Sequence, residues 1–231
     1  MTGHVHRTVA VVHGPRDPRG TLGSLIGAFD GRTELQFVVA GRDPFPDPST
    51  VDLGIVMGSG ASAYDDTVPW LADELQWLSR MADESSVLGV CFGAQALARA
   101  LGGSVGRATE AELGWVTVET DDPALVGPGP WFEFHFDRFT TPPAANELAR
   151  NRVGAQAFRY GRSLAVQFHP EISPRALDAW RAAGGADTDP AIVAAFDRLE
   201  AGIAEREDAA RSRAAGLVEA FWSEVAGFGA Y

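Results

Sequence analysis

The first half of the chain alternates short apolar runs with amphipathic stretches. The apolar runs are rich in Val, Ile and Leu and are followed by turn-forming or helix-starting residues, a pattern typical of buried strands. They cover Thr8–His13, Glu34–Ala40, Leu53–Met57 and Val87–Val90. Apolar residues at helical spacing between and after these runs predict helices over Gly20–Phe29, from Pro69 to Met81, and over Ala94–Leu101. Strands that alternate with helices predict an α/β fold with a doubly wound, mainly parallel sheet flanked by helices.

The second half changes to a strict alternation of apolar and polar positions. Gly114–Glu119 and Trp131–Phe139 alternate in this way, which predicts a small antiparallel extension at the edge of the sheet. A strand pair is expected at Ala155–Tyr160 and Ser163–His169, followed by a helix from Ser173 to Gly184. A further apolar face predicts C-terminal helical structure over about 190–226, as one long helix or two. We expect residues 1–231 to form a single domain.

Composition narrows the function classes. The chain has 31 acidic and 19 basic side chains, a net charge of −12, and no lysine. Nucleic-acid binding is disfavoured, because phosphate contacts need a basic face. The single cysteine cannot form an internal disulfide, and neither a signal-like stretch nor a membrane-length apolar run is found. We therefore expect a cytoplasmic protein that binds no membrane.

That single cysteine, Cys91, stands where an apolar strand turns into a helix. Glycines lie two residues before and two after it, at Gly89 and Gly93, which is the arrangement of a nucleophile elbow with cysteine in place of serine. Glycine leaves room where a sharp turn brings backbones together. The N–H groups at the start of the following helix favour thiolate over thiol. A lone cysteine is more often a small buried hydrophobe, so this motif needs a second one to decide the matter.

The second motif is Gln167-Phe168-His169-Pro170-Glu171. In an extended segment residues two apart point the same way, so the spacing predicts that His169 and Glu171 are neighbours at a strand end. A carboxylate beside an imidazole fixes its tautomer and stabilises its protonated form, and such an imidazole can move protons for a thiol nucleophile. Together with the Cys91 elbow, this favours nucleophilic catalysis.

With these motifs the sequence resembles the class I, triad-type glutamine amidotransferases, and among them the stand-alone family related to the glutaminase domain of GMP synthetase. The resemblance extends from about residue 50 to 175 and implies a flavodoxin-like fold. Four segments carry it: Met57–Asp65, Gly89–Gln95, Phe134–Phe139 and Gln167–Glu171.

The resemblance implies a role for each matched residue. Cys91 would attack the side-chain amide of glutamine, His169 would transfer protons, and Glu171 would orient His169. The backbone N–H groups of Ser59 and Phe92 would hold the oxyanion. The implied substrate-binding residues are Gly58, Gly60, Ala61, Gln95, His135, Phe136 and Asp137.

Two matched segments depart from the family pattern. Gly58-Ser59-Gly60 stands where relatives usually have Gly-Gly-Pro, and serine disfavours positive φ, so the oxyanion loop is expected to differ or to need a partner. Phe136 stands in place of a glycine and is expected to narrow the glutamine site. For His135 a core or supporting role is favoured over direct chemistry. No metal site and no cofactor are expected, because His4, His6 and His13 have no partners at metal-ligand spacing.

Three functions compete at this stage. The first is a glutaminase that supplies ammonia to a separate synthase or ligase subunit, since the chain has no room for a second catalytic domain. The second is a γ-glutamyl hydrolase or peptidase that uses the same three residues on larger γ-glutamyl amides. The third is a non-catalytic, regulatory homologue. The pocket around Ala61 and Phe136 would separate the first two.

Overall fold

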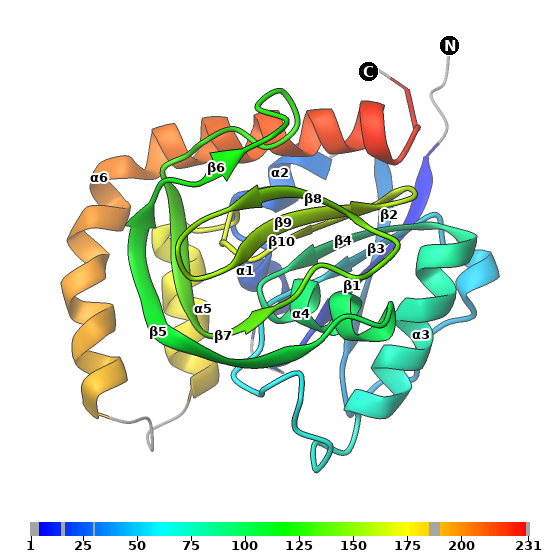
Figure 1. Cartoon of the computed structure of the whole chain (residues 1–231), viewed down its shortest axis with the longest axis horizontal. Coiled ribbons are helices and arrows are strands. Elements are labelled where there is room, and N and C mark those ends of the chain that lie inside the picture. The colour runs from blue at the N-terminus through cyan, green and yellow to red at the C-terminus, as the bar shows by residue number, and fades with distance from the viewer. Residues whose placement is uncertain (1–4, 15–16, 30, 185–189, 230–231) are drawn as a thin grey trace.

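A computed structural model describes residues 5–14, 17–29, 31–184 and 190–229 of the chain. An eight-stranded sheet forms its centre, with the strand order β2-β1-β3-β4-β10-β9-β8-β6 (Figure 1). Its strands are β1 (His6–Val12), β2 (Thr33–Val39), β3 (Leu53–Val56), β4 (Ser86–Val90), β6 (Glu119–Thr120), β8 (Asn146–Arg150), β9 (Ala155–Tyr160) and β10 (Ser163–Val166).

The five strands from β2 to β10 run parallel, and β9, β8 and β6 continue the sheet in antiparallel fashion. The inner parallel strands β3, β4 and β10 are buried along their whole length, which explains why they are mostly apolar. The edge strand β2 is partly exposed. In β1, Ala10 and Val12 pack into one core and Val9 and Val11 into another on the opposite face. The predicted mainly parallel α/β sheet is thus confirmed.

Helices cover both faces of the sheet. One core contains residues of α3 and α4, and the other contains residues of α2, α6 and η2. The helices are α1 (Pro18–Thr21), α2 (Leu25–Phe29), η1 (Pro48–Thr50), α3 (Leu71–Glu84), α4 (Phe92–Ala100), α5 (Pro174–Gly184), α6 (Pro190–Ala220) and the π-helical turn η2 (Phe221–Val225).

Two long strands form a second sheet of their own. β5 (Val105–Val116) and β7 (Trp131–Phe139) pair antiparallel, and Figure 1 shows them as a green ribbon that curves past the central sheet. Their register shifts between Arg107 and Glu112, the irregularity of a β-bulge, which re-aims side chains. The antiparallel extension expected from Gly114–Glu119 is therefore mostly a separate sheet, and only Glu119 and Thr120 join the edge of the main one.

Three predicted elements differ in detail. The helix expected over Gly20–Phe29 is broken into α1 and α2, because Gly23 takes a φ of 48° and any Cβ there would meet the backbone of Glu171. The strand expected to reach His169 ends at Val166. The C-terminal pattern forms one long helix, α6, with η2 at its end.

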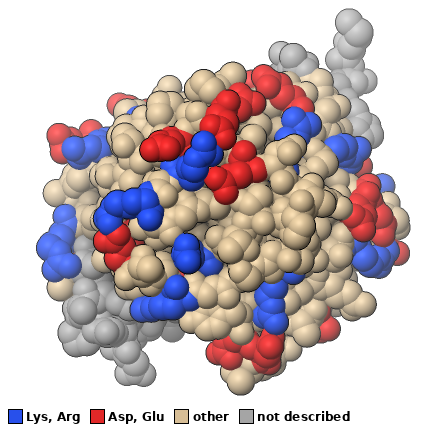
Figure 2. Space-filling view, viewed as in Figure 1, with Lys and Arg blue, Asp and Glu red and all other residues tan. Residues whose placement is uncertain are grey.

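No helix in the described ranges is long and apolar enough to cross a membrane. On the face shown in Figure 2, arginines and acidic side chains are interspersed, and the basic ones do not gather into a continuous patch.

Candidate functional site

Cys91 lies at a strained turn between β4 and α4. Its φ of 53° makes it the one non-glycine residue with positive φ in the described part of the chain, and its ψ is −108°. Both flanking glycines are sterically required. A Cβ on Gly89 would lie 2.8 Å from the carbonyl oxygen of Gly93, and a Cβ on Gly93 would lie 2.0 Å from that of Val56. The sequence around Cys91 therefore folds as the predicted elbow, and the residue is only 6% exposed.

Phe92 opens α4 and is buried. The first intrahelical bond that reaches back to the turn runs from the N–H of Gln95 to the carbonyl of Cys91, at 3.0 Å. The first N–H groups of a helix have no acceptor within the helix, so the N–H of Phe92 is directed outward from the start of α4 beside Cys91.

His169 and Glu171 follow β10 and are both buried. Nδ1 of His169 lies 2.7 Å from Oε1 of Glu171, which leaves Nε2 without a hydrogen bond from the described residues. Burial by itself lowers the pKa of His169, but the charges of Glu171 and of the Cys91 thiolate raise it more. The pKa therefore lies well above the ordinary value of 6.5. An imidazole in this state can donate a proton from Nε2.

Gly58 brings the two motifs together. A Cβ at this position would lie 3.2 Å from Cε1 of His169 and 3.8 Å from Cβ of Cys91. The loop from Gly58 to Ala61 follows β3 and thus lies across the gap between the two residues. Ser59 does not adopt positive φ, and its hydroxyl accepts a hydrogen bond from the N–H of Ala61 at 3.1 Å. None of residues 58–61 has a positive φ, so serine at position 59 fits this loop without backbone strain.

Two residues that the sequence analysis missed, His13 and Glu74, support the same loop. Nδ1 of His13 lies 3.0 Å from the carbonyl oxygen of Gly58, and its Nε2 lies 3.0 Å from Oε2 of the fully buried Glu74. Both ring nitrogens of His13 thus face oxygen atoms of the protein, and the imidazole ties the loop to α3. The position of His13 was the available signal. His13 directly follows β1, which pairs with β3, and active sites gather at the carboxyl ends of parallel strands.

A second set of polar contacts ties α4 to the strand β7. The side-chain amide of Gln95 donates to the backbone oxygen of Asp137 at 3.0 Å and to Oε1 of Gln167 at 3.2 Å. The amide of Gln167 in turn lies 3.7 Å from the sulfur of Cys91. The carboxylate of Asp137 accepts a bond of 2.6 Å from the hydroxyl of Ser62, just beyond the glycine loop. These contacts join α4, β7 and the segment after the glycine loop close to Cys91.

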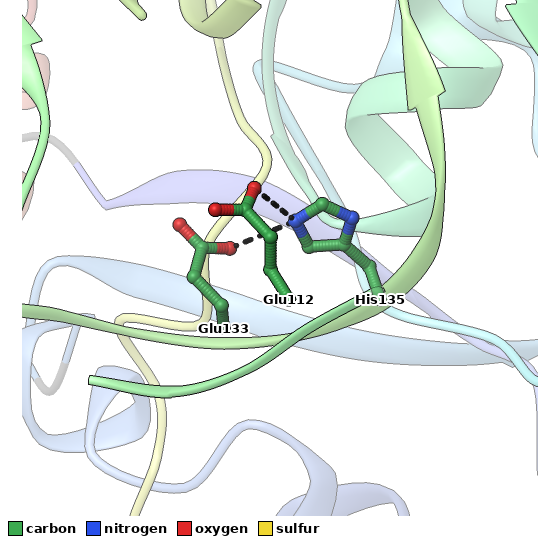
Figure 3. Close-up of side chains that lie close together, drawn as sticks. All are labelled: Glu112, Glu133 and His135. Carbon is green, nitrogen blue, oxygen red and sulfur yellow. Dashed lines mark ion pairs between the residues drawn. The ribbon is translucent and has the colours of Figure 1, made fainter. Parts of the chain in front are cut away.

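His135 is buried on β7 and both of its ring nitrogens face protein groups. Nδ1 donates to the backbone oxygen of Asp137 at 2.9 Å, and Nε2 faces the carboxylates of Glu112 and Glu133 (Figure 3). Burial lowers its pKa, but the two carboxylates raise it more, to about 10. The neighbouring Phe136 is only partly buried and packs under the guanidinium of Arg107.

A surface hollow of about 890 Å³ lies elsewhere, between the proline-rich loop at 41–48 and α3. Its lining includes Arg42, Phe45, Trp70 and Trp77, and none of the residues assigned to chemistry above. Trp70 links it to the site only indirectly, by packing against His13 and Phe92.

Comparisons with known proteins identify the family of the chain. The family model for glutamine amidotransferase class-I matches residues 47–180, a range that contains Gly58, Cys91, His169 and Glu171.

Curated relatives include GMP synthases. The chain is 35% identical over 130 residues to the glutamine-hydrolyzing GMP synthase of Synechococcus sp., covering 52% of this chain and 23% of that protein. It is 31% identical over 128 residues to one subunit of the glutamine-hydrolyzing GMP synthase of Sulfurisphaera tokodaii, covering 51% of this chain and 66% of its relative. The chain thus spans about a quarter of the length of the first of these relatives and two thirds of the second.

Solved structures share the fold over nearly the whole chain. A glutamine amidotransferase from Thermotoga maritima superimposes with a TM-score of 0.77 at 24% identity, covering 94% of this chain and 98% of that one. The family model matches more than half of the chain and shows that it belongs to the class I glutamine amidotransferase family.

Proposed function

We propose that the protein hydrolyses the side-chain amide of L-glutamine through Cys91, His169 and Glu171. One observation carries the proposal: Cys91 at a strained elbow and the His169–Glu171 pair, joined at 2.7 Å, both lie against Gly58. Nucleophile, base and orienting carboxylate are the three parts that covalent amide hydrolysis requires.

In the proposed reaction the Cys91 thiolate attacks the side-chain carbonyl carbon of glutamine. The resulting oxyanion accepts hydrogen bonds from the backbone N–H groups of Phe92 and Ser59, and losing one such donor raises an activation barrier by roughly 3 kcal/mol in comparable enzymes. His169 gives its Nε2 proton to the leaving nitrogen, so ammonia departs and a γ-glutamyl thioester remains. Water then attacks the thioester while His169 takes its proton, and glutamate leaves with the thiolate restored.

The remaining site residues would bind the substrate or hold the walls of its pocket. Gly58, Gly60 and Ala61 form one side, and His135, Phe136 and Asp137 form the other, with Gln95 between them. The contacts of Gln95 and Asp137 favour a positioning role for their side chains and leave the backbone of this region to face glutamine. The partly buried Phe136 would limit the size of the substrate.

The ammonia would pass to a separate synthase or ligase subunit. This part of the proposal is supported by the relative from Sulfurisphaera tokodaii, which is named as one subunit of a GMP synthase. Because the aligned region covers only part of each GMP synthase, the acceptor chemistry is left open.

The test is release of glutamate and ammonia from L-glutamine by the purified chain, beside larger γ-glutamyl amides. We expect equal amounts of both products, and none from Cys91→Ala, which should retain its far-UV circular dichroism. A preference for the larger amides would favour the γ-glutamyl hydrolase interpretation instead.

If the purified chain turns over none of these substrates, it would be treated with a diazoketone analogue of glutamine. Mass spectrometry of the peptide that contains Cys91 would then show whether the thiol is labelled. Labelling would indicate a glutaminase that needs its synthase partner. No labelling and no turnover would count against catalysis and favour a regulatory homologue.

A further inference from the structure

A buried cluster of two carboxylates and one imidazole lies beside the proposed catalytic residues and takes no part in the proposed reaction. Glu112 of β5 stands opposite His135 of β7 in the strand register, and Glu133 precedes His135 by two positions on the same strand. All three side chains therefore project to one side of the β5–β7 ribbon, where they converge (Figure 3). Their side chains are no more than 5% exposed.

The distances within the cluster fit a metal coordination sphere. Nε2 of His135 lies 3.1 Å from Oε2 of Glu112 and 3.2 Å from Oε2 of Glu133. Ligands bound to tetrahedral Zn²⁺ at about 2.0 Å are about 3.3 Å from each other. One ligand atom from each residue lies within 4.8 Å of the other two. A single ion can therefore reach all three with small adjustments of the side chains.

Hydrogen bonds from residues around the cluster orient His135 and Glu112, as is usual for residues that bind a metal. Nδ1 of His135 donates to a backbone carbonyl at 2.9 Å, which directs Nε2 into the cluster, as is usual for metal-binding histidines. Glu112 accepts one bond from the amide of Asn151 at 2.7 Å and one from the amide of Gln156 at 2.9 Å. These bonds fix the carboxylate without closing the side that faces His135.

Glu133 supplies an independent observation. Its side chain is fully buried, and neither carboxylate oxygen has a hydrogen bond from any residue in the described ranges. Nε2 of His135 likewise has no well-aligned hydrogen bond within the part of the chain that the structure describes. A buried carboxylate without hydrogen bonds is costly, and here only the imidazole of His135 faces it, at 3.2 Å. A divalent cation that displaces the Nε2 proton of His135 would cancel the charge of the two carboxylates.

We propose that Glu112, Glu133 and His135 bind a divalent transition-metal ion, with Zn²⁺ as the first candidate. The ligands are one carboxylate oxygen from each glutamate and Nε2 of His135, and water completes a tetrahedral sphere. A mixed set of one imidazole and two carboxylates suits Zn²⁺ better than Mg²⁺, which prefers oxygen ligands alone. This site departs from the expectation, drawn from sequence alone, that the chain has no metal.

The test uses the full-length Cys91→Ala variant, because Cys91 with His169 offers zinc a competing thiolate site. This chain is stripped with a chelator, incubated with Zn²⁺, desalted and analysed for metal. We expect about one zinc per chain to be retained, and no magnesium in a parallel incubation. X-ray absorption of the zinc-loaded sample should show only nitrogen and oxygen ligands at about 2.0 Å, including one imidazole.

Two substitutions in the same background assign the ligands. Glu133→Gln keeps the shape of the side chain and should lower zinc affinity by at least about tenfold, whereas Glu119→Gln, at an exposed carboxylate of β6, should leave affinity unchanged. Should Glu133→Gln fail to fold, Asn151→Ala leaves all three ligands in place. It removes a hydrogen bond to Glu112, together with the turn contacts of Asn151 to Val153 and Gly154, and should still weaken zinc binding about tenfold.

Three results would overturn the proposal: no zinc retained, a zinc shell without imidazole, or equal zinc affinity in the Glu133→Gln and Glu119→Gln variants. In the first case the cluster would hold protons in place of a metal, one on His135 and one on Glu133. None of these outcomes depends on glutamine turnover, so failure of this proposal is distinct from failure of the proposed function.

Discussion

At the scale of single residues, the site contains positions where an added methyl group would displace the proposed catalytic side chains. Gly58 is such a position, because the space that its missing Cβ leaves is bounded by His169 at 3.2 Å and Cys91 at 3.8 Å. An alanine there would displace the imidazole by a few tenths of an ångström or displace the loop.

We expect Gly58→Ala to reduce kcat/KM for glutamine by roughly tenfold or more with little loss of stability, because small misplacement of reacting groups is expensive in rate. Gly216→Ala is the matched control, since Gly216 lies on α6 with no atom within 4 Å of the added carbon and no positive φ. Steady-state kinetics and thermal melts of both variants test this. Unchanged kinetics in Gly58→Ala would show that the loop relaxes freely.

Cys91 combines reactivity with backbone strain. Its φ of 53° and ψ of −108° belong to a region that glycine tolerates and other residues do not. Such strain costs about 1–3 kcal/mol, whereas glycine loses about 0.5–1 kcal/mol more chain entropy on folding than alanine.

The balance predicts that Cys91→Gly unfolds with a free energy roughly 1 kcal/mol higher than Cys91→Ala, although both lack the thiol. Urea denaturation of the two variants measures the difference. Equal or reversed stabilities would mean that packing of the Cβ outweighs the strain at this turn.

At the scale of elements, the C-terminal segment is part of the core. Phe221 of η2 is fully buried in the same cluster as Leu25 of α2 and Val166 of β10. The segment thus covers one face of the parallel sheet, and the end of α6 widens into a π-helical turn as it does so.

Phe221→Ala should lower the free energy of unfolding by about 3–5 kcal/mol, because it leaves a cavity between α2, η2 and the sheet. Tyr64→Ala, at an aromatic side chain that is 41% exposed, should cost less than about 1 kcal/mol. Chemical denaturation compares them, and similar losses for the two would place η2 outside the cooperative core.

At the scale of the whole molecule, two hydrophobic cores lie on opposite faces of shared strands. Neighbouring residues of β1 belong to different cores, so neither core can be lost without disrupting the strand that supports the other. The expectation of a single domain over residues 1–231 is open to a direct test on this basis.

We expect unfolding in urea to be a single transition, with tryptophan fluorescence and far-UV circular dichroism superimposed. Trp77 lies in one core and Trp222 in the other, so fluorescence reports on both faces. Two separated transitions would contradict a single cooperative unit.

Local patterns in the sequence were sufficient for much of the fold and for the centre of the site. The apolar runs identified the parallel strands, and the flanking glycines of Cys91 predicted the elbow, because steric exclusion at a sharp turn acts between residues close in sequence. His169 and Glu171 are two residues apart, and in an extended segment such residues point to the same side. This local rule predicted that their side chains are neighbours.

Only the tertiary structure decided what surrounds these residues. The His13–Glu74 support of Gly58 joins three elements far apart in the chain, and the cluster of Glu112, Glu133 and His135 depends on the register of β5 against β7 after a bulge. Register and sheet order arise from contacts between distant segments, and a shift of one residue would turn Glu112 to the opposite face. The sequence by itself thus determined the elements and the reactive motifs, whereas long-range packing decided which polar groups are buried together.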